Sequence, residues 1–404
     1  MPDPSKPLIS VGTAAFRRAC LALFSGGFAT FAAMYCVQPL LPVFTREFGL
    51  NPAASSISLS VSTGVLAVAM LGSSFVSDLI GSKATMVGAL ILSSLFTVAL
   101  SVTSDWNQIL VLRGLAGLAL SGFPAISIAY LADEMDRTAL GIAVGLTIAG
   151  NSIGGMSGRL IVSVVADYAS WRMALAVLGG LCLLCSLILW AGLPASRKTV
   201  ATDLSAGGLA ASFVRHLRDP GLLMLFAVAF CLMGGFVTLY NYVGFRLLQP
   251  PFSLSQTLVG FVFLLYAAGT ASSSIAGWVA NRTGRRTALL LTISLMLFGV
   301  ALTIPDSLWL IVVGIGLFTV GFFAAHAVAS SWVGLRADGA KAQASSLYML
   351  TYYMGSSIAG SLGGVFWSHA GWPGVAGLIG CLGLIALALS IALSRTPPPA
   401  WLQT

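Results

Sequence analysis

Charge is what this chain has least of. Charged residues make up 8% of its 404 residues, whereas hydrophobic residues make up 57%. A water-soluble chain carries roughly a quarter of charged residues, so the composition excludes an ordinary soluble protein. The six cysteines suggest no metal or redox site, because all of them lie in apolar stretches. The CxxC pair of Cys182 and Cys185 is better explained as small buried residues than as a redox or zinc motif.

Apolar runs of about 20 residues recur along nearly the whole chain, and each is long enough to cross a bilayer as a helix. Helices are expected because backbone groups in lipid must bond within their own segment. The sequence therefore predicts an all-α polytopic membrane protein with twelve transmembrane helices. The expected spans are 19–43, 56–77, 84–103, 108–131, 139–162, 173–193, 221–244, 257–279, 287–304, 308–332, 343–366 and 373–393.

Most of the 20 lysines and arginines fall on one side of these spans. Such a bias marks the cytoplasmic side, so we expect a multi-pass protein of the bacterial inner (cytoplasmic) membrane with both termini in the cytoplasm. The net charge of +8 is then explained by topology and gives no reason to expect a nucleic-acid partner.

The chain repeats itself about half its length apart. Residues 74–83 and 277–286 are similar polar bridges between apolar segments, and residues 150–155 resemble residues 355–360. A long polar stretch divides the spans equally. We therefore predict two pseudo-symmetric six-helix bundles, 1–193 and 221–404, joined by a cytoplasmic linker at 194–220, with a short cytoplasmic tail after the second bundle. This is a transporter architecture.

The two bridges carry the most specific motif. Together with the span count and the linker, they resemble the major facilitator superfamily, whose signature is G-x-L-a-D-r-x-G-r-k. The first copy departs from it at Ser74 and Ser82, and Asn281 replaces the acid in the second. In the family this loop latches the cytoplasmic side, which implies a gating role; the alternative is that the charges only anchor the topology. The residues that match are Asp78, Gly81, Lys83, Gly277, Arg282, Gly284, Arg285 and Arg286.

Residues 112–117 resemble the family's second signature, R-x-x-x-G. Arg113 would lie on the order of 9 Å inside its span, at the rise of a helix. A guanidinium in lipid is costly and usually faces the interior of the bundle, which suggests proton coupling or substrate contact. The alternative is that Arg113 snorkels outward.

Residues 150–155 resemble the signature G-P-x-x-G-G of the drug:proton antiporter branch, with Asn151 in place of proline. Residues 35–39, 150–159 and 321–332 extend the resemblance to the arabinose-efflux-permease-like group of that branch. Glycines at Gly150, Gly154 and Gly155 would let a neighbouring helix approach closely. Close packing without a coupling role is the alternative.

The 12 acidic residues avoid the middle of every predicted span, where Arg113, Arg159 and His326 lie instead. The sign of the charge favours neutral or anionic substrates. His326 could carry the coupling proton, because an unperturbed histidine titrates near neutral pH. The alternatives are a packed His326 bonded to a nearby hydroxyl, such as Ser330, and an Arg159 that snorkels outward.

Aromatic and amide side chains are the remaining candidates for the cavity lining, since a tyrosine offers a flat apolar face and one hydroxyl. Core packing is the alternative for each of them. They are Tyr35, Gln38, Tyr240, Asn241, Tyr266, Tyr348 and Tyr352.

From these features we predict a secondary active transporter that exports a small neutral or anionic organic compound by proton-coupled alternating access. Proton-coupled uptake of a carboxylate- or siderophore-like compound is the alternative. A membrane enzyme is disfavoured, because the spans hold no carboxylate pair, catalytic triad, metal cluster or nucleotide loop. A receptor is disfavoured, because the sequence offers no sizeable soluble domain to relay a signal. We expect no catalytic residue, metal or cofactor. The expected partners are a small-molecule substrate, protons and the lipid bilayer, and a monomer suffices.

Overall fold

The structure, a computed structural model, describes residues 8–194, 196, 213–337, 340–393 and 395–396. Within these residues the chain is helical and forms no strand, and eleven helices are long and apolar enough to cross a membrane. The last of them, α15 (Lys341–Leu393), has 53 residues and is interrupted by Gly371, whose φ of 58° is not helical. It therefore supplies two crossing segments, which confirms the predicted all-α fold with twelve spans.

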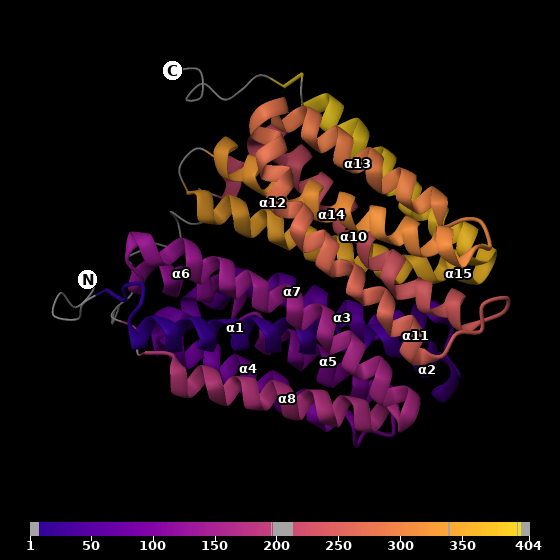
Figure 1. The fold of residues 1–404 in the computed structure, drawn as a ribbon, viewed down its shortest axis with the longest axis horizontal. Helices are drawn as coiled ribbons and strands as arrows, with labels where there is room; N and C mark the ends of the chain where they lie inside the picture. Colours follow the sequence, from indigo (N-terminus) through magenta and orange to yellow (C-terminus); the bar gives the residue numbers. More distant parts are fainter. Residues whose placement is uncertain (1–7, 195, 197–212, 338–339, 394, 397–404) are drawn as a thin grey trace. The chain divides into compact units, whose positions relative to one another are not determined.

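The chain divides into two compact units (Figure 1). Unit 1 comprises residues 1–43 and 61–203, and unit 2 comprises residues 44–60 and 204–404. The predicted bundle boundaries remain a prediction, and most of the predicted linker lies outside the described residues.

Unit 1 is built around α1 (Ala14–Tyr35), which packs against α7 (Arg137–Tyr168) and α8 (Trp171–Gly192). Its other helices are α4 (Ser82–Leu100), α5 (Trp106–Leu120) and α6 (Pro124–Glu134), together with the later part of α3 (Pro52–Ile80). α4 packs against α5 and α8.

Unit 2 is built around α10 (Pro220–Leu248), which packs along α15. It further contains α11 (Gln256–Gly260), the 3-10 turn η2 (Phe261–Leu265), α12 (Tyr266–Thr283), α13 (Arg285–Leu302) and α14 (Leu308–Arg336). α14 packs against both α12 and α13.

The same backbone contact recurs in the two units. A Cβ atom on Gly150 of α7 would lie 2.3 Å from the carbonyl oxygen of Phe24 on α1. A Cβ atom on Gly355 of α15 would lie 2.2 Å from the carbonyl oxygen of Phe230 on α10. In both units a glycine therefore lets one helix touch the main chain of the next, as close packing in membranes requires.

The two polar bridges are shorter than the sequence predicted. α3 continues to Ile80 and α12 to Thr283, so single glycines separate them from α4 and α13. Gly81 and Gly284 have φ angles of 87° and 85°, a region that side chains with a Cβ rarely adopt. The predicted bridges were too long, because polar residues also occupy helix ends that extend beyond the apolar core.

Several predicted spans contain a break. In the first predicted span, α1 ends at Tyr35, and the chain continues through the 3-10 turn η1 (Gln38–Leu40) into α2 (Leu41–Glu47). The predicted span 108–131 is broken between α5 and α6, where Pro124 starts the second helix. Proline favours the first turn of a helix because its missing N–H would have no partner there.

A carboxylate starts the long helix α7. Asp136 accepts hydrogen bonds from the hydroxyl of Thr138 at 2.7 Å and from the N–H groups of Thr138 and Ala139 at 2.9 and 2.8 Å. The hydroxyl bond from Thr138, followed by one from Ser10, lowers the pKa of Asp136 to about 2.

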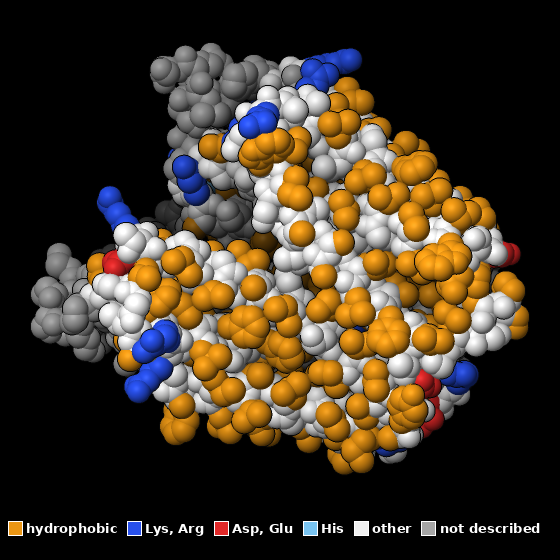
Figure 2. Space-filling model, viewed as in Figure 1, with side chains coloured by type: hydrophobic (Ala, Val, Ile, Leu, Met, Phe, Trp, Pro, Cys, Tyr) orange, Lys and Arg blue, Asp and Glu red, His pale blue; other side chains and the backbone are white. Residues whose placement is uncertain are grey.

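Hydrophobic side chains cover much of the face shown in Figure 2, while Lys and Arg side chains gather near its edge. Exposed apolar residues are numerous in both units, among them Val68, Leu79, Leu291 and Trp309. Such outer surfaces are expected of helices that face lipid.

Candidate functional site

Arg113 lies on α5 and is fully buried. Its guanidinium donates to the carbonyl oxygens of Ala33, at 2.9 Å, and of Met34, and it lies 3.6 Å from the sulfur of Cys36. These acceptors belong to the end of α1, where carbonyl groups have no partner further along the helix. The alternative of an outward-snorkelling Arg113 is therefore wrong. Cys36 was not among the predicted site residues.

Arg159 is also buried, so its snorkelling alternative is wrong as well. Its Nε donates to Oε1 of Gln38 at 2.6 Å, another N–H donates to the carbonyl oxygen of Gly155, and its Cζ lies 4.3 Å from the centre of the Tyr35 ring. We call Tyr35, Gln38 and Arg159 the Arg159 group. Three predicted site residues thus meet where α1 breaks into η1, and the cation lies against an aromatic face.

The acidic residues described in unit 1 lie at helix ends or caps. Asp105 and Asp136 are the N-caps of α5 and α7, and Asp167 is the last residue but one of α7. Asp78 precedes the last two residues of α3, and Asp133 and Glu134 end α6. Among the described residues of unit 1, two arginines are therefore buried inside the unit, whereas the acidic residues lie at the ends of its helices.

An aromatic cluster occupies the interior of unit 2. Phe236 of α10 stacks on Phe322 of α14 with ring centres 3.8 Å apart, and it contacts Tyr240 and Tyr266 at 5.0 and 5.3 Å. Tyr352 of α15 stacks on Phe322 at 6.4 Å. We call these five residues the aromatic cluster. It brings three predicted tyrosines together. The two phenylalanines were missed, although Phe236 lies one helical turn before Tyr240 and so shares its face.

His326 joins this cluster to another predicted tyrosine. Its Nδ1 lies 2.9 Å from the hydroxyl of Tyr348, and its ring lies 4.7 Å from that of Tyr352. The expected alternative partner, Ser330, instead donates to the carbonyl oxygen of Ala327 at 3.2 Å. The hydroxyl that bonds His326 therefore belongs to Tyr348 on α15. The sequence had suggested only Ser330, which lies one turn further along α14.

Tyr240 and Asn241 are sequence neighbours that point to different helices. The Tyr240 hydroxyl lies 2.8 Å from the hydroxyl of Thr319 on α14, whereas the Asn241 amide donates to the carbonyl oxygen of Gly360 on α15 at 3.4 Å. Both are buried within α10. Asn241 is thus placed at the α10–α15 contact and not in the aromatic cluster.

The antiporter-like residues of α7 face α1. Gly154 would place a Cβ atom 2.2 Å from the carbonyl oxygen of Phe28, and Asn151 Oδ1 occupies the space where a Cβ of Gly27 would be. Gly155 is less crowded, since the nearest atom to its Cβ position is a guanidinium nitrogen of Arg159 at 3.4 Å. The motif therefore packs two helices, while its coupling role remains a prediction.

The predicted gating residues lie at the two glycine turns. Asp78 and Arg282 are on the final turns of α3 and α12, and Lys83 lies on the first turn of α4. Gly277 has open space around its Cβ position, so sterics do not require glycine there. Arg285 and Arg286 begin α13. The latch that the motif implies remains a prediction.

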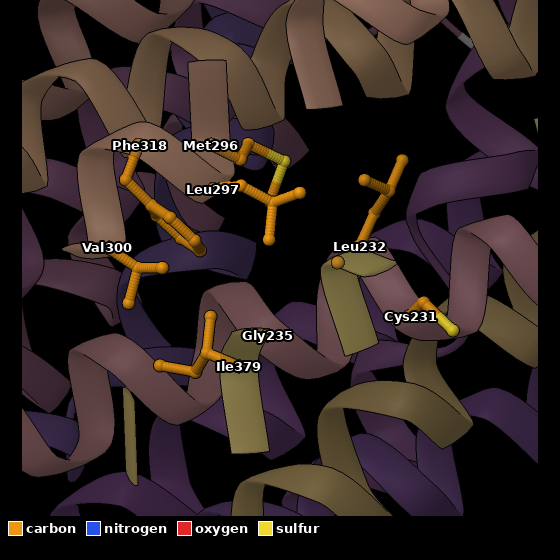
Figure 3. A pocket seen from close by; sticks show the side chains of 9 residues that line it. Cys231, Leu232, Gly235, Met296, Leu297, Val300, Phe318 and Ile379 are labelled. Atoms are coloured by element: carbon orange, nitrogen blue, oxygen red, sulfur yellow. The ribbon is translucent and has the colours of Figure 1, made fainter. Parts of the chain in front are cut away.

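A small apolar pocket lies among α10, α13, α14 and α15 (Figure 3), with about 240 Å³ of empty space that is partly open to the outside. None of the predicted site residues lines it. The lining residues are Cys231, Leu232, Gly235, Met296, Leu297, Val300, Phe318, Ile379 and Gly383.

Comparison with known proteins gives consistent matches. Residues 23–249 and 246–404 match the sequence profile of the Major Facilitator Superfamily. The inner membrane transport protein YnfM of Escherichia coli (strain K12) is 51% identical over 387 residues, which cover 96% of this chain and 93% of YnfM. The MFS-type transporter YybF of Bacillus subtilis (strain 168) is 43% identical over 388 residues, which cover 96% of each.

Solved structures share the fold at low sequence identity. A bacterial homologue of the human lysosomal transporter Spinster, in an inward-facing and unoccupied conformation, superposes with a TM-score of 0.78 at 14% identity. The match covers 95% of this chain and 98% of the other. The nucleoside transporter NupG gives a TM-score of 0.77 at 14% identity, covering 94% and 99%.

Proposed function

This chain belongs to the major facilitator superfamily, as its duplicated motif predicted, and from that premise we propose that it exports a small neutral or anionic organic compound in exchange for protons. The family membership makes it a membrane transporter rather than an enzyme. The finer proposal also places it in the bacterial inner membrane with both termini in the cytoplasm, and has it work by alternating access as a monomer.

The observation that carries the substrate class is the Arg159 group. Arg159 is buried, and Gln38, which accepts its Nε–H, is a neutral amide. This hydrogen bond orients the guanidinium, and the amide that accepts it carries no charge. Arg113 adds a second buried cation to the same unit. An anionic or strongly dipolar substrate group gains most from such a field.

The proton pathway is proposed to use His326. The ring is half-buried in unit 2, and its Nδ1 is within hydrogen-bond distance of Tyr348. A histidine bonded to a hydroxyl can change protonation while the partner switches between donating and accepting. The aromatic cluster beside it offers flat apolar surface for an organic substrate.

The proposal is tested with purified protein in liposomes that contain a trapped pH dye. Anionic, neutral and cationic compounds are added outside without a preset gradient, and protein-free liposomes correct for passive permeation. Exchange with protons makes the interior more alkaline, whereas co-transport makes it more acidic, whichever way the protein is inserted. Uptake of a carboxylate- or siderophore-like compound by co-transport is thus separated from export by exchange.

The variants give the test its specificity. Arg113→Ala is expected to abolish the response to an anionic compound, and the matched variant Arg137→Ala, at an exposed arginine of the same unit, is expected to retain it. His326→Gln is expected to stop proton movement yet preserve exchange of labelled for unlabelled compound. A response to cationic compounds alone contradicts the proposed substrate class, and proton movement by His326→Gln contradicts the proposed pathway.

A further inference from the structure

The two copies of the family motif differ in charge at their glycine turns. Around Gly81 the first copy combines Asp78 with Lys83, whereas the second copy, around Gly284, has Asn281 in place of the acid. Three arginines follow Asn281 within five residues, at 282, 285 and 286. The turn between α12 and α13 therefore carries a concentrated positive charge, whereas the turn between α3 and α4 is nearly neutral.

The first of these arginines lies on an outward-facing stripe of α12. Its guanidinium Cζ is 3.9 Å from the centre of the Trp278 ring, and Trp278 is 56% exposed. Ile275, one turn earlier, is 60% exposed. Residues spaced by three and four share a helix face, so Ile275, Trp278 and Arg282 form one exposed stripe that runs from apolar through aromatic to cationic. This order suits the boundary between lipid chains and head groups.

The other two arginines begin the next helix, at the same turn. Arg286 is exposed, and Arg285 Nε is buried without a hydrogen-bond partner among the described residues. Among the described residues, no side chain caps the first turn of α13, so its main-chain N–H groups add to the positive potential there. Guanidinium groups bind phosphate oxygens through paired hydrogen bonds.

We infer that the α12–α13 turn binds the phosphate head group of an anionic phospholipid, with an acyl chain lying along Ile275 and Trp278. Net negative charge on the lipid is required, because the site has three cations and no acid between residues 281 and 286. The α3–α4 turn is expected not to bind such a lipid, because Asp78 repels a phosphate beside it. This inference concerns the outer surface of unit 2 and holds whatever the protein transports.

The test is native mass spectrometry of the detergent-purified full chain titrated with phosphatidylglycerol or with zwitterionic phosphatidylcholine of the same acyl chains. The wild type is expected to retain phosphatidylglycerol preferentially. Each arginine near an anionic lipid contributes on the order of a five-fold change in affinity, so Arg282→Gln/Arg285→Gln/Arg286→Gln should weaken phosphatidylglycerol binding by about 100-fold. The charge-matched control is Arg17→Gln/Arg18→Gln/Arg137→Gln, at three exposed arginines of unit 1, and it should bind as the wild type does.

A milder variant guards against misfolding of the triple one. Asn281→Asp restores the acid found at the first turn and is expected to lower phosphatidylglycerol affinity about five-fold. A parallel measurement follows the rise in Tm on adding phosphatidylglycerol, which should be lost in the triple variant and reduced in Asn281→Asp. Equal retention of both lipids by the wild type overturns the inference, and so does an equal loss of binding in the unit 1 control.

Discussion

The contact between α1 and α7 makes a sharp prediction for Gly154→Ala. The added Cβ atom would lie 2.2 Å from the carbonyl oxygen of Phe28 and 2.5 Å from its Cα, where ordinary contacts begin at 3.4 Å. Both atoms belong to the main chain, so no side-chain rotation relieves the overlap, and the helices must separate by roughly 1 Å. Overpacking of this kind costs about 3 kcal/mol, and alanine's better helix propensity returns about 1 kcal/mol.

The matched control is Gly145→Ala on the same helix, where a Cβ atom meets nothing within 4 Å. It should stabilise the protein by about 1 kcal/mol through helix propensity alone. Thermal unfolding of the two variants in one detergent, at one scan rate, is the assay, because membrane proteins unfold irreversibly and Tm depends on the scan. We expect Gly154→Ala to unfold several degrees below the wild type and Gly145→Ala at or above it. Equal Tm values would refute the packing argument.

Three further predictions follow from the same contacts. Gly355→Ala should lower the Tm of the protein as Gly154→Ala does, while Gly380→Ala, in open space on α15, should not. Gln38→Glu places a carboxylate on Arg159 and cancels its charge, so the liposome response to anionic compounds should fall at least about ten-fold with no loss of Tm. Asp136→Asn should lower Tm at neutral pH. The folded protein lowers the pKa of Asp136 to about 2, whereas the unfolded value is about 3.9. The carboxylate therefore stabilises the fold fully above about pH 3.9, and this stabilisation is lost as the pH falls through 2. The Tm values of the wild type and Asp136→Asn should converge over that window, and a constant difference between them would contradict the argument.

The fold could be predicted from the sequence because its signals are local. Each span is a single run of apolar residues, and a run of that length in lipid has few alternatives to a helix. Breaks inside spans were not predicted. The interruption after Tyr35 did have a local signal, because Pro39 has no N–H to donate to the carbonyl oxygen of Tyr35, but the hydropathy of 19–43 does not register it. The lengths of the turns at Gly81 and Gly284 were overestimated, because the polar residues before each glycine belong to the ends of α3 and α12.

The candidate site was predictable in its residue types but not in its pairings. Arg159 and Gln38 are 121 positions apart. Neither segment indicates that the helix break before Gln38 places the Gln38 amide against Arg159 on α7. Local reasoning therefore favoured a snorkelling Arg159. The same limit applies to His326, whose partner Tyr348 belongs to another helix 22 positions later. Contacts between helices depend on helix rotation and depth, which hydropathy leaves undetermined.

The two units share main-chain contacts between helices but differ in the side chains that surround those contacts. What the units share is main-chain contact, as at Gly150 and Gly355, and such contact requires only that no Cβ intervene. The residues that follow these glycines differ, yet Asn151 Oδ1 and Ser356 Oγ are both buried without a hydrogen-bond partner among the described residues. A shared backbone with divergent side chains permits cations in unit 1 and aromatic rings with His326 in unit 2. On this division of roles, Gln38→Glu should lower the transport of anionic compounds without stopping proton movement by the remaining transport, whereas His326→Gln should stop proton movement and leave the exchange of labelled for unlabelled compound.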